Sequence, residues 1–286
     1  MASPCTILCA DTAQWFALAE AEVRRIETKY SRFLADSVLS QINANSGDWH
    51  TLDEETAALF DFAASCYLAS EGLFDISSGV LQQAWPFKAT DPEARRPPED
   101  KVLARLLPYV GFDKIKRRGP EIFLPLGMRL DFGGIAKEYA VDRVCMLLSD
   151  LGAKDFLVNL GGDIRVFNHH APPWMVGIVH PRQEASTVAS LPLTNAAIAT
   201  SGDYERYFDF AGKRYCHLLD PRNGFPVQQA QSVSVIASSC MVAGSLSSMA
   251  MLSTDPEQFL LESGANSLLI DARGEAHRFD SNKKIV

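Results

Sequence analysis

The chain has 286 residues, of which 47% are hydrophobic and 22% charged, and its formal net charge is -8. This composition excludes a disordered chain, and the acidic balance excludes a nucleic-acid partner, because a phosphate backbone demands a basic protein face. No segment approaches the roughly 18 uninterrupted apolar residues of a membrane span, so we expect no membrane insertion.

The first predicted element is a β-strand over residues 6–10. Neither a basic region nor a long apolar stretch precedes it, so a signal peptide is disfavoured and we expect a cytoplasmic protein. Six cysteines are scattered along the chain without a C-x-x-C pair. That spacing favours reduced, mostly buried thiols over a disulfide framework or a zinc site.

Apolar residues at helical spacing predict a helix from Gln14 to about Phe33, and a second helix runs from Asp53, a plausible N-cap, to Ala69. The stretch 89–99 is rich in proline and charge and predicts an exposed connection. We therefore expect a single domain over residues 1–286, with a possible subdomain junction near 89–100.

The second half of the chain mixes strands and helices. A helix is predicted over 135–151 and a small-residue helix over 241–252. Strands are predicted over 156–160, 164–167, 174–179, around 197, and over 206–210, 215–219, 233–237 and 267–271. A tight hairpin turn is expected at 161–163. Because no regular βαβ rhythm is present, the fold class is α+β, with mixed or antiparallel sheets and packed helices.

A glycine pair, Gly133-Gly134, leads directly into the helix that carries Lys137. Backbone N–H groups at such a helix start can approach an anion closely, and the lysine ammonium would meet a phosphate one turn later. The spacing matches neither common nucleotide-binding motif. A pair of glycines that only turns the chain is the alternative interpretation.

His217 is predicted to lie on a strand, just before a turn that begins at Asp220-Pro221 and closes at Gly224. The polar turn at 201–203 precedes this strand. A histidine between two such turns is a candidate for proton transfer, although a lone strand histidine is also a common structural residue.

Taken in order, the segments of this chain resemble the motifs of the FAD:protein FMN transferase family, also called the ApbE family. The residues that carry the resemblance lie at 1–3, 31–43, 74–81, 85–87, 130–142, 159–163, 199–204 and 217–224. The match at 130–142 is to L-D-x-G-G-I-A-K-G-Y-A-V-D, with Glu138 in place of a glycine. The resemblance therefore covers essentially the whole chain.

This resemblance implies an α+β fold with a T-fold-like element and an activity that moves FMN from FAD to a Ser or Thr hydroxyl of an acceptor flavoprotein, releasing AMP. Mg²⁺ is the implied metal. The matching positions for contact with FAD are Met1, Phe33, Phe74, Asp75, Ile76, Asp131, Lys137, His217 and Leu218. His217 matches the histidine associated with transfer and is the candidate general base. Gly134 and Ser248 match positions that hold the metal.

The main departure lies on the late helix, where the family carries A-D-A-x-x-T. The matching residues are 243–248, so that Gly244 stands where the metal-ligand aspartate is expected and Ser248 where the threonine is expected. A glycine has no oxygen ligand, so Mg²⁺ binding should be weaker. Besides the transferase, a catalytically impaired FAD-binding protein and a slow FAD pyrophosphatase remain as interpretations.

Overall fold

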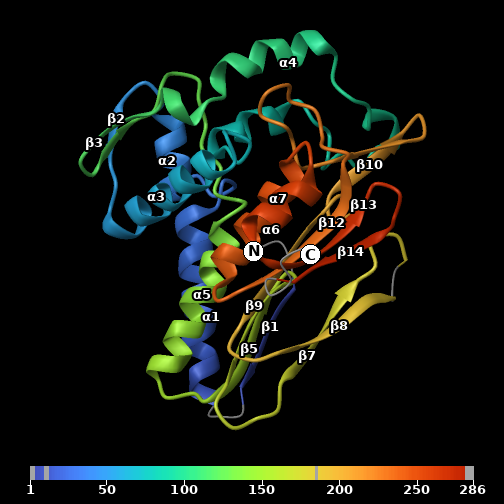
Figure 1. Cartoon of the computed structure of the whole chain (residues 1–286). Coiled ribbons are helices and arrows are strands. Elements are labelled where there is room, and N and C mark those ends of the chain that lie inside the picture. Colours follow the sequence, from blue (N-terminus) through green and yellow to red (C-terminus); the bar gives the residue numbers. More distant parts are fainter. Residues whose placement is uncertain (1–3, 10–12, 184–185, 281–286) are drawn as a thin grey trace.

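The computed structural model describes residues 4–9, 13–183 and 186–280. Its centre is a seven-stranded sheet with the order β1-β5-β6-β9-β12-β13-β14, and each neighbouring pair is antiparallel (Figure 1). The strands are Cys5–Cys9 (β1), Asp155–Leu160 (β5), Asp163–Asn168 (β6), Ala197–Gly202 (β9), Ala230–Ala237 (β12), Asn266–Asp271 (β13) and Ala276–Phe279 (β14). The expected α+β class with antiparallel sheets is confirmed.

Helices α5 (Ala136–Asp150) and α6 (Cys240–Leu252) cover one face of this sheet. Helix α1 (Ala13–Tyr30) packs against α5, and α7 (Pro256–Ser263) packs against α6 (Figure 1). The main core lies between these helices and the sheet, because alternate residues of each strand point to the helical side.

A hairpin covers the opposite face of the sheet. It consists of β7 (Trp174–Val179) and β8 (Thr187–Leu193). Val176 and Ile178 of the hairpin pack against Val166 and Ile198 of the sheet, all of them buried. The central sheet is therefore sandwiched between helices and a two-stranded ribbon.

The segments between α1 and α5 form a second group of elements (Figure 1). Its helices are α2 (Val38–Ala44), α3 (Glu54–Ala69) and α4 (Asp100–Leu106), and its short 3₁₀ helices are η1 (Ile76–Gln83), η2 (Pro92–Ala94), η3 (Leu107–Tyr109) and η4 (Phe112–Lys114). A small sheet has the order β2-β4-β3, formed by Trp49–Thr51, Glu121–Phe123 and Lys116–Arg118. The hairpin β10 (Tyr207–Phe210) and β11 (Lys213–Cys216) comes from the second half of the chain.

Trp85 joins this group of elements to the hairpin β10-β11. Its ring lies 5.6 Å from that of Tyr215 and 6.2 Å from that of Phe208, measured between centroids. Its indole N–H donates to the backbone oxygen of Gly224 at 2.9 Å. This buried contact fixes the segment after η1 against the segment that carries His217.

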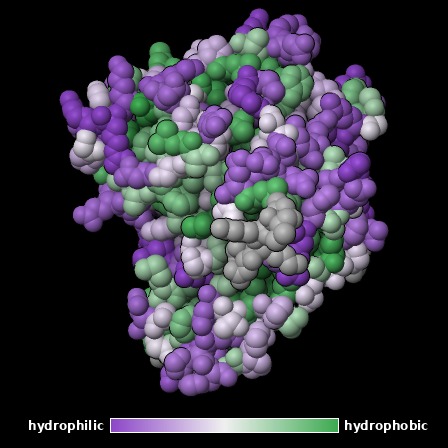
Figure 2. All heavy atoms as spheres, in the orientation of Figure 1, coloured by the Kyte–Doolittle hydropathy of each residue, from purple (hydrophilic) through white to green (hydrophobic). Residues whose placement is uncertain are grey.

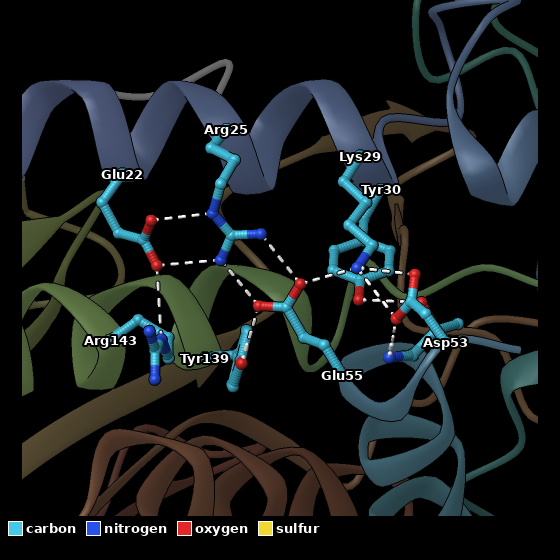
Figure 3. Close-up of polar contacts among 9 residues, drawn as sticks. Glu22, Arg25, Lys29, Tyr30, Asp53, Glu55, Tyr139 and Arg143 are labelled. Atoms are coloured by element: carbon cyan, nitrogen blue, oxygen red, sulfur yellow. Dashed lines mark hydrogen bonds and ion pairs between the residues drawn. The ribbon is translucent and has the colours of Figure 1, made fainter.

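A network of charged side chains ties three helices together (Figure 3). Glu55, at the start of α3, accepts hydrogen bonds from Arg25 at 2.6 Å and Lys29 at 2.7 Å on α1, and from the Tyr139 hydroxyl at 2.8 Å on α5. The Arg25 guanidinium, with Lys29 and Tyr139, holds the pKa of Glu55 well below its usual range. The position of α3 relative to α1 and α5 is therefore held by ionic contacts as well as by packing.

Several predicted elements are confirmed nearly to the residue. Asp53 is the N-cap of α3 and accepts the backbone N–H of Thr56 at 2.8 Å. The expected turn at 161–163 joins β5 to β6, with positive φ angles of 63° at Gly161 and 94° at Gly162. The proline-rich stretch near 89–99 is mostly exposed, as expected. Cys66, Cys145, Cys216 and Cys240 are buried thiols.

Two predicted boundaries were wrong. Helix α1 ends at Tyr30 and not near Phe33. Strand β11 ends at Cys216, so His217 lies just beyond the strand and not on it. The reason is the turn at Asp220, whose carboxylate accepts the backbone N–H of Arg222 at 2.8 Å. The next strand-like pairing after Cys216 is an isolated bridge between Leu219 and Pro226.

In the described part of the chain, no helix is both long enough and apolar enough to cross a membrane. The face shown in Figure 2 is largely hydrophilic, with smaller apolar areas between polar side chains. This distribution agrees with the composition of an ordinary globular chain.

Candidate functional site

A cleft of about 330 Å³ lies between the second group of elements and the hairpin β10-β11. It is lined by side chains from segments that are far apart in the sequence. The lining residues are Arg32, Phe33, Asn43, Gly79, Gln82, Gln83, Trp85, Pro86, Phe87, Lys88, Ala89, Arg129, Leu130, Asp131, Arg206 and His217. Three of the predicted site residues, Phe33, Asp131 and His217, therefore line one cleft.

Asp131 is fixed in this cleft by contacts on several sides. Its carboxylate forms an ion pair with Arg32 and accepts the backbone N–H of Gly133 at 2.9 Å. Its backbone N–H donates to the oxygen of Ile76 at 2.8 Å. Gly79 lies directly beneath it, since a Cβ atom at position 79 would be 2.6 Å from the Cβ of Asp131. The close approach of η1 to Asp131 therefore requires glycine at this position.

Cationic side chains gather along the same cleft. Lys88 Nζ lies 3.5 Å from the centroid of the Phe33 ring, which is 62% exposed. Burial lowers the pKa of Lys88, and the nearby Arg32 and Arg206 lower it further. The pKa of Arg206 is also lowered, first by burial and then by Arg32. Cations that disfavour one another's charge in this way are typical of a site that binds an anion.

His217 stands at the edge of the cleft, partly exposed, with its Nδ1 atom buried. Its backbone N–H donates to the oxygen of Arg206 at 3.0 Å, and its own carbonyl accepts from Gln82 at 3.1 Å. Burial, followed by the charge of Arg206, lowers the pKa of His217 to about 3. The imidazole is therefore neutral near pH 7.

The helix start at Gly133-Gly134 lies next to this cleft but does not line it. A Cβ atom at position 134 would be 3.3 Å from Phe74 Cζ, so the glycine permits close packing on that buried ring. Helix α5 begins at Ala136, with no side-chain hydrogen bond at its N-cap. Lys137 forms an ion pair with Asp163, at the turn between β5 and β6.

Hydroxyl groups cluster where α6 faces strand β9. The Ser201 hydroxyl lies 2.9 Å from that of Ser247 and 3.0 Å from that of Ser248. One turn before Ser248, Gly244 faces helix α5 across from Glu138. A Cβ atom at position 244 would be 2.5 Å from Glu138 Cγ. The space above Gly244 is thus filled by a glutamate side chain.

Other predicted site residues have structural contacts. Asp75 is buried and is the N-cap of η1; its two carboxylate oxygens accept the backbone N–H groups of Ser77 at 2.7 Å and Phe112 at 3.0 Å. Phe74 and Ile76 are buried in the main core, and Leu218 is partly buried against it. None of these four lines the cleft. Met1 lies outside the described residues.

Sequence reasoning did not single out Arg206, Lys88 or Arg32 as site residues. Arg32 lies within the matched segment 31–43, and the other two residues follow closely after the matched segments 85–87 and 199–204. Their common signal is positive charge, which the structure concentrates in one cleft although the chain as a whole is acidic.

Comparison with models of protein families matches residues 1–269 to the ApbE family. The chain belongs to the ApbE family. The resemblance inferred from the ordered motifs is therefore confirmed over nearly the full length.

Two curated relatives in the ApbE family are named FAD:protein FMN transferase. The protein of Haemophilus influenzae is 31% identical over 248 residues, covering 80% of this chain and 69% of the relative. A protein of Klebsiella pneumoniae is 40% identical over 229 residues, covering 75% of this chain and 68% of the relative.

The fold is also that of solved ApbE structures. The ApbE protein of Thermotoga maritima has a TM-score of 0.88 and 30% identity, covering 96% of this chain and 92% of that one. The apo form of the Pseudomonas stutzeri flavinyl transferase ApbE has a TM-score of 0.86 at 24% identity, which bears on the fold alone.

Proposed function

We propose that this chain is an enzyme that transfers FMN from FAD to a Ser or Thr hydroxyl of an acceptor flavoprotein, releasing AMP, with Mg²⁺ as cofactor. Support for the reaction class comes from the names of its ApbE relatives. The observation that carries the proposal for this chain is the cationic cleft, in which a neutral His217 lies beside Arg206.

The cleft supplies what a dinucleotide needs. Arg32, Lys88 and Arg206 offer positive charge for a diphosphate, and the exposed ring of Phe33 offers an apolar surface for an aromatic ring system. Asp131, held by Arg32 and Gly133, keeps the glycine-rich segment next to the cleft in place.

In the transfer step, the acceptor oxygen bonds to the phosphorus of the FMN half and the bond from that phosphorus to the AMP phosphate oxygen breaks. We assign His217 as the group that takes the proton of the acceptor hydroxyl, because it lines the cleft at the position that matches the histidine associated with transfer in the family. AMP departs with the bonding electrons as a phosphate anion, which the nearby cations stabilise.

The residues next to the cleft also fit a hard divalent cation. Such ions prefer oxygen ligands, and the Ser248 hydroxyl and the Gly134 carbonyl are our proposed donors. A buried oxygen without a hydrogen-bond partner among the described residues, Glu138 Oε2, is present in the same region. When bound, Mg²⁺ would polarise the diphosphate and neutralise its charge.

The test is to incubate the protein with FAD, Mg²⁺ and a flavin-acceptor domain, and to look for fluorescent flavin on the acceptor in a denaturing gel. An acceptor in which alanine replaces the target Ser or Thr is the matched control. Labelled wild-type acceptor together with stoichiometric AMP supports the proposal. FMN and AMP without labelled acceptor would instead show a pyrophosphatase, and tight FAD binding without any product would show a binding protein. The cytoplasmic location stays a prediction.

A further inference from the structure

Helices α5 and α6 contact each other through two sets of residues, one turn apart. The Asp142 carboxylate on α5 accepts the backbone N–H groups of Cys240 and Met241, both at 2.9 Å, at the start of α6. One turn earlier on α5 is Glu138, and one turn later on α6 is Gly244, and these two are in contact. The two helices therefore run antiparallel along this contact, with matching steps of one turn.

One further turn along α6 from Gly244 is Ser248, and two positions before the first residue of α5 is Gly134. Residues four apart lie on the same face of a helix, so Gly244 and Ser248 both face α5. Glu138 therefore contacts the residue one turn before Ser248 and follows Gly134 by four positions along the chain, which relates it to both proposed metal donors.

The Glu138 carboxylate is buried without full compensation of its charge. The residue is 6% exposed, and Oε2 has no hydrogen-bond partner among the described residues. Oε1 lies 3.9 Å from Lys137 Nζ, but that ammonium is already in closer contact with Asp163. A buried carboxylate oxygen is destabilising unless a cation or a hydrogen-bond donor meets it, so this position is suited to binding a cation.

We propose that Glu138 is the carboxylate ligand of the divalent cation in this chain, reaching from α5 into the space above Gly244. The inference rests on the proposed function. A Cβ atom at position 244 would lie 3.1 Å from Glu138 Cδ and 3.1 Å from Oε1, so the glutamate carboxylate stands where a short acidic side chain on α6 would project. Glycine at 244 and glutamate at 138 then form one functional pair: the first leaves the space that the second fills.

In this chain, Gly244→Asp alone is not an informative test of metal binding. Adding an aspartate at 244 to the wild-type chain places its Cβ atom 2.5 Å from Glu138 Cγ, so that Gly244→Asp alone tests a clash and not a restored ligand. The informative variants are Glu138→Gln, which keeps the shape and removes the charge, Glu138→Gly, and the exchange Glu138→Gly with Gly244→Asp.

Mn²⁺ binding gives a readout that does not depend on turnover. It is measured as the decrease in the electron paramagnetic resonance signal of unbound Mn²⁺. It is measured with and without saturating FAD, and Mg²⁺ is added as competitor. We expect Glu138→Gln and Glu138→Gly to weaken Mn²⁺ binding at least tenfold and the exchanged double variant to restore it. Glu54→Gln, at an exposed position on α3, is the matched control and should bind as wild type.

Unchanged Mn²⁺ affinity in Glu138→Gln would overturn the proposal, and so would a wild-type protein that binds FAD but no Mn²⁺. FAD binding is measured separately by flavin fluorescence on each variant. Failure of the wild-type chain to bind FAD would count against the proposed function, whereas the Mn²⁺ titration without FAD tests Glu138 on its own. Melting temperatures without metal show that each variant is folded.

Discussion

The carboxylate of Asp142 accepts the backbone N–H of Cys240 at 2.9 Å, which joins the middle of helix α5 to the first residue of helix α6. Asp142 also accepts from Arg165 on β6 at 2.6 Å and is almost fully buried. One side chain thus links two helices and the sheet beneath them, and it supports the register in which Glu138 meets Gly244.

We expect Asp142→Asn to lower the free energy of unfolding by roughly 2 kcal/mol, because it weakens charge-assisted hydrogen bonds to a buried helix start. Urea unfolding monitored by circular dichroism measures the change. Asp150→Asn, at an exposed position in the last turn of the same helix, should change the stability by less than about 0.5 kcal/mol. Equal effects of the two substitutions would contradict the linking role of Asp142.

Replacing His217 separates proton transfer from binding. His217→Ala should reduce the rate of flavin transfer at least a hundredfold, the range typical of a lost general base, while FAD affinity stays within about threefold of wild type. A gel assay with fluorescent flavin measures the first quantity and fluorescence titration the second. If the variant transferred flavin at the wild-type rate, His217 would have no part in the chemistry.

The lowered pKa of His217 also predicts how stability depends on pH. The folded-state pKa is about 3, below the usual value of 6.5. As the pH falls below 6.5, the imidazole of the unfolded chain is therefore protonated, whereas that of the folded chain stays neutral. The folded state is therefore favoured fully above pH 6.5 and loses up to about 1.4 kcal/mol per pH unit from this residue between 6.5 and 3.

The measurement compares wild type with His217→Asn by urea unfolding at pH 7.5 and pH 5. We expect the wild type to lose about 1 to 2 kcal/mol more than the variant over this interval, because asparagine has no proton to gain. Identical pH dependence of the two proteins would show that the imidazole titrates normally in the folded state.

Gly79 provides a test of the cleft that removes no charged group. Gly79→Ala would put a methyl group 2.6 Å from the Cβ of Asp131, so the aspartate and its partner Arg32 must shift. We expect FAD affinity to fall at least tenfold. Ser78→Ala, at the adjacent position, is the control and should bind FAD as wild type does. A Gly79→Ala protein with normal affinity would place FAD away from Asp131.

Local patterns in the sequence predicted those parts of the fold that depend on neighbouring residues. Asp53 as a helix N-cap and the glycine turn after β5 follow from residue chemistry within one turn of chain. The same reasoning extended the strand that carries His217 to residue 219, whereas β11 ends at Cys216, since the turn at Asp220 redirects the chain earlier than the apolar pattern indicates.

The site was predicted less completely, for a physical reason. Asp131 and His217 were found through motifs, but Arg206 and Lys88 join them only through tertiary packing. Asp75 belongs to a matching motif and yet has its carboxylate turned to the backbone N–H groups of Ser77 and Phe112. A motif gives the residue type, whereas the direction of the side chain depends on which donors the fold brings near it.

The contact between Glu138 and Gly244 means that the two positions cannot vary independently. Carboxylates at both positions would collide, and a carboxylate at neither would remove the metal ligand that we propose. We therefore expect the effect on metal binding of a mutation at 138 or 244 to depend in sign on the residue at the other position. If the columns of an alignment of relatives are read one at a time, a carboxylate is missing at position 244. The carboxylate that we propose to replace it, that of Glu138, stands on the opposite helix.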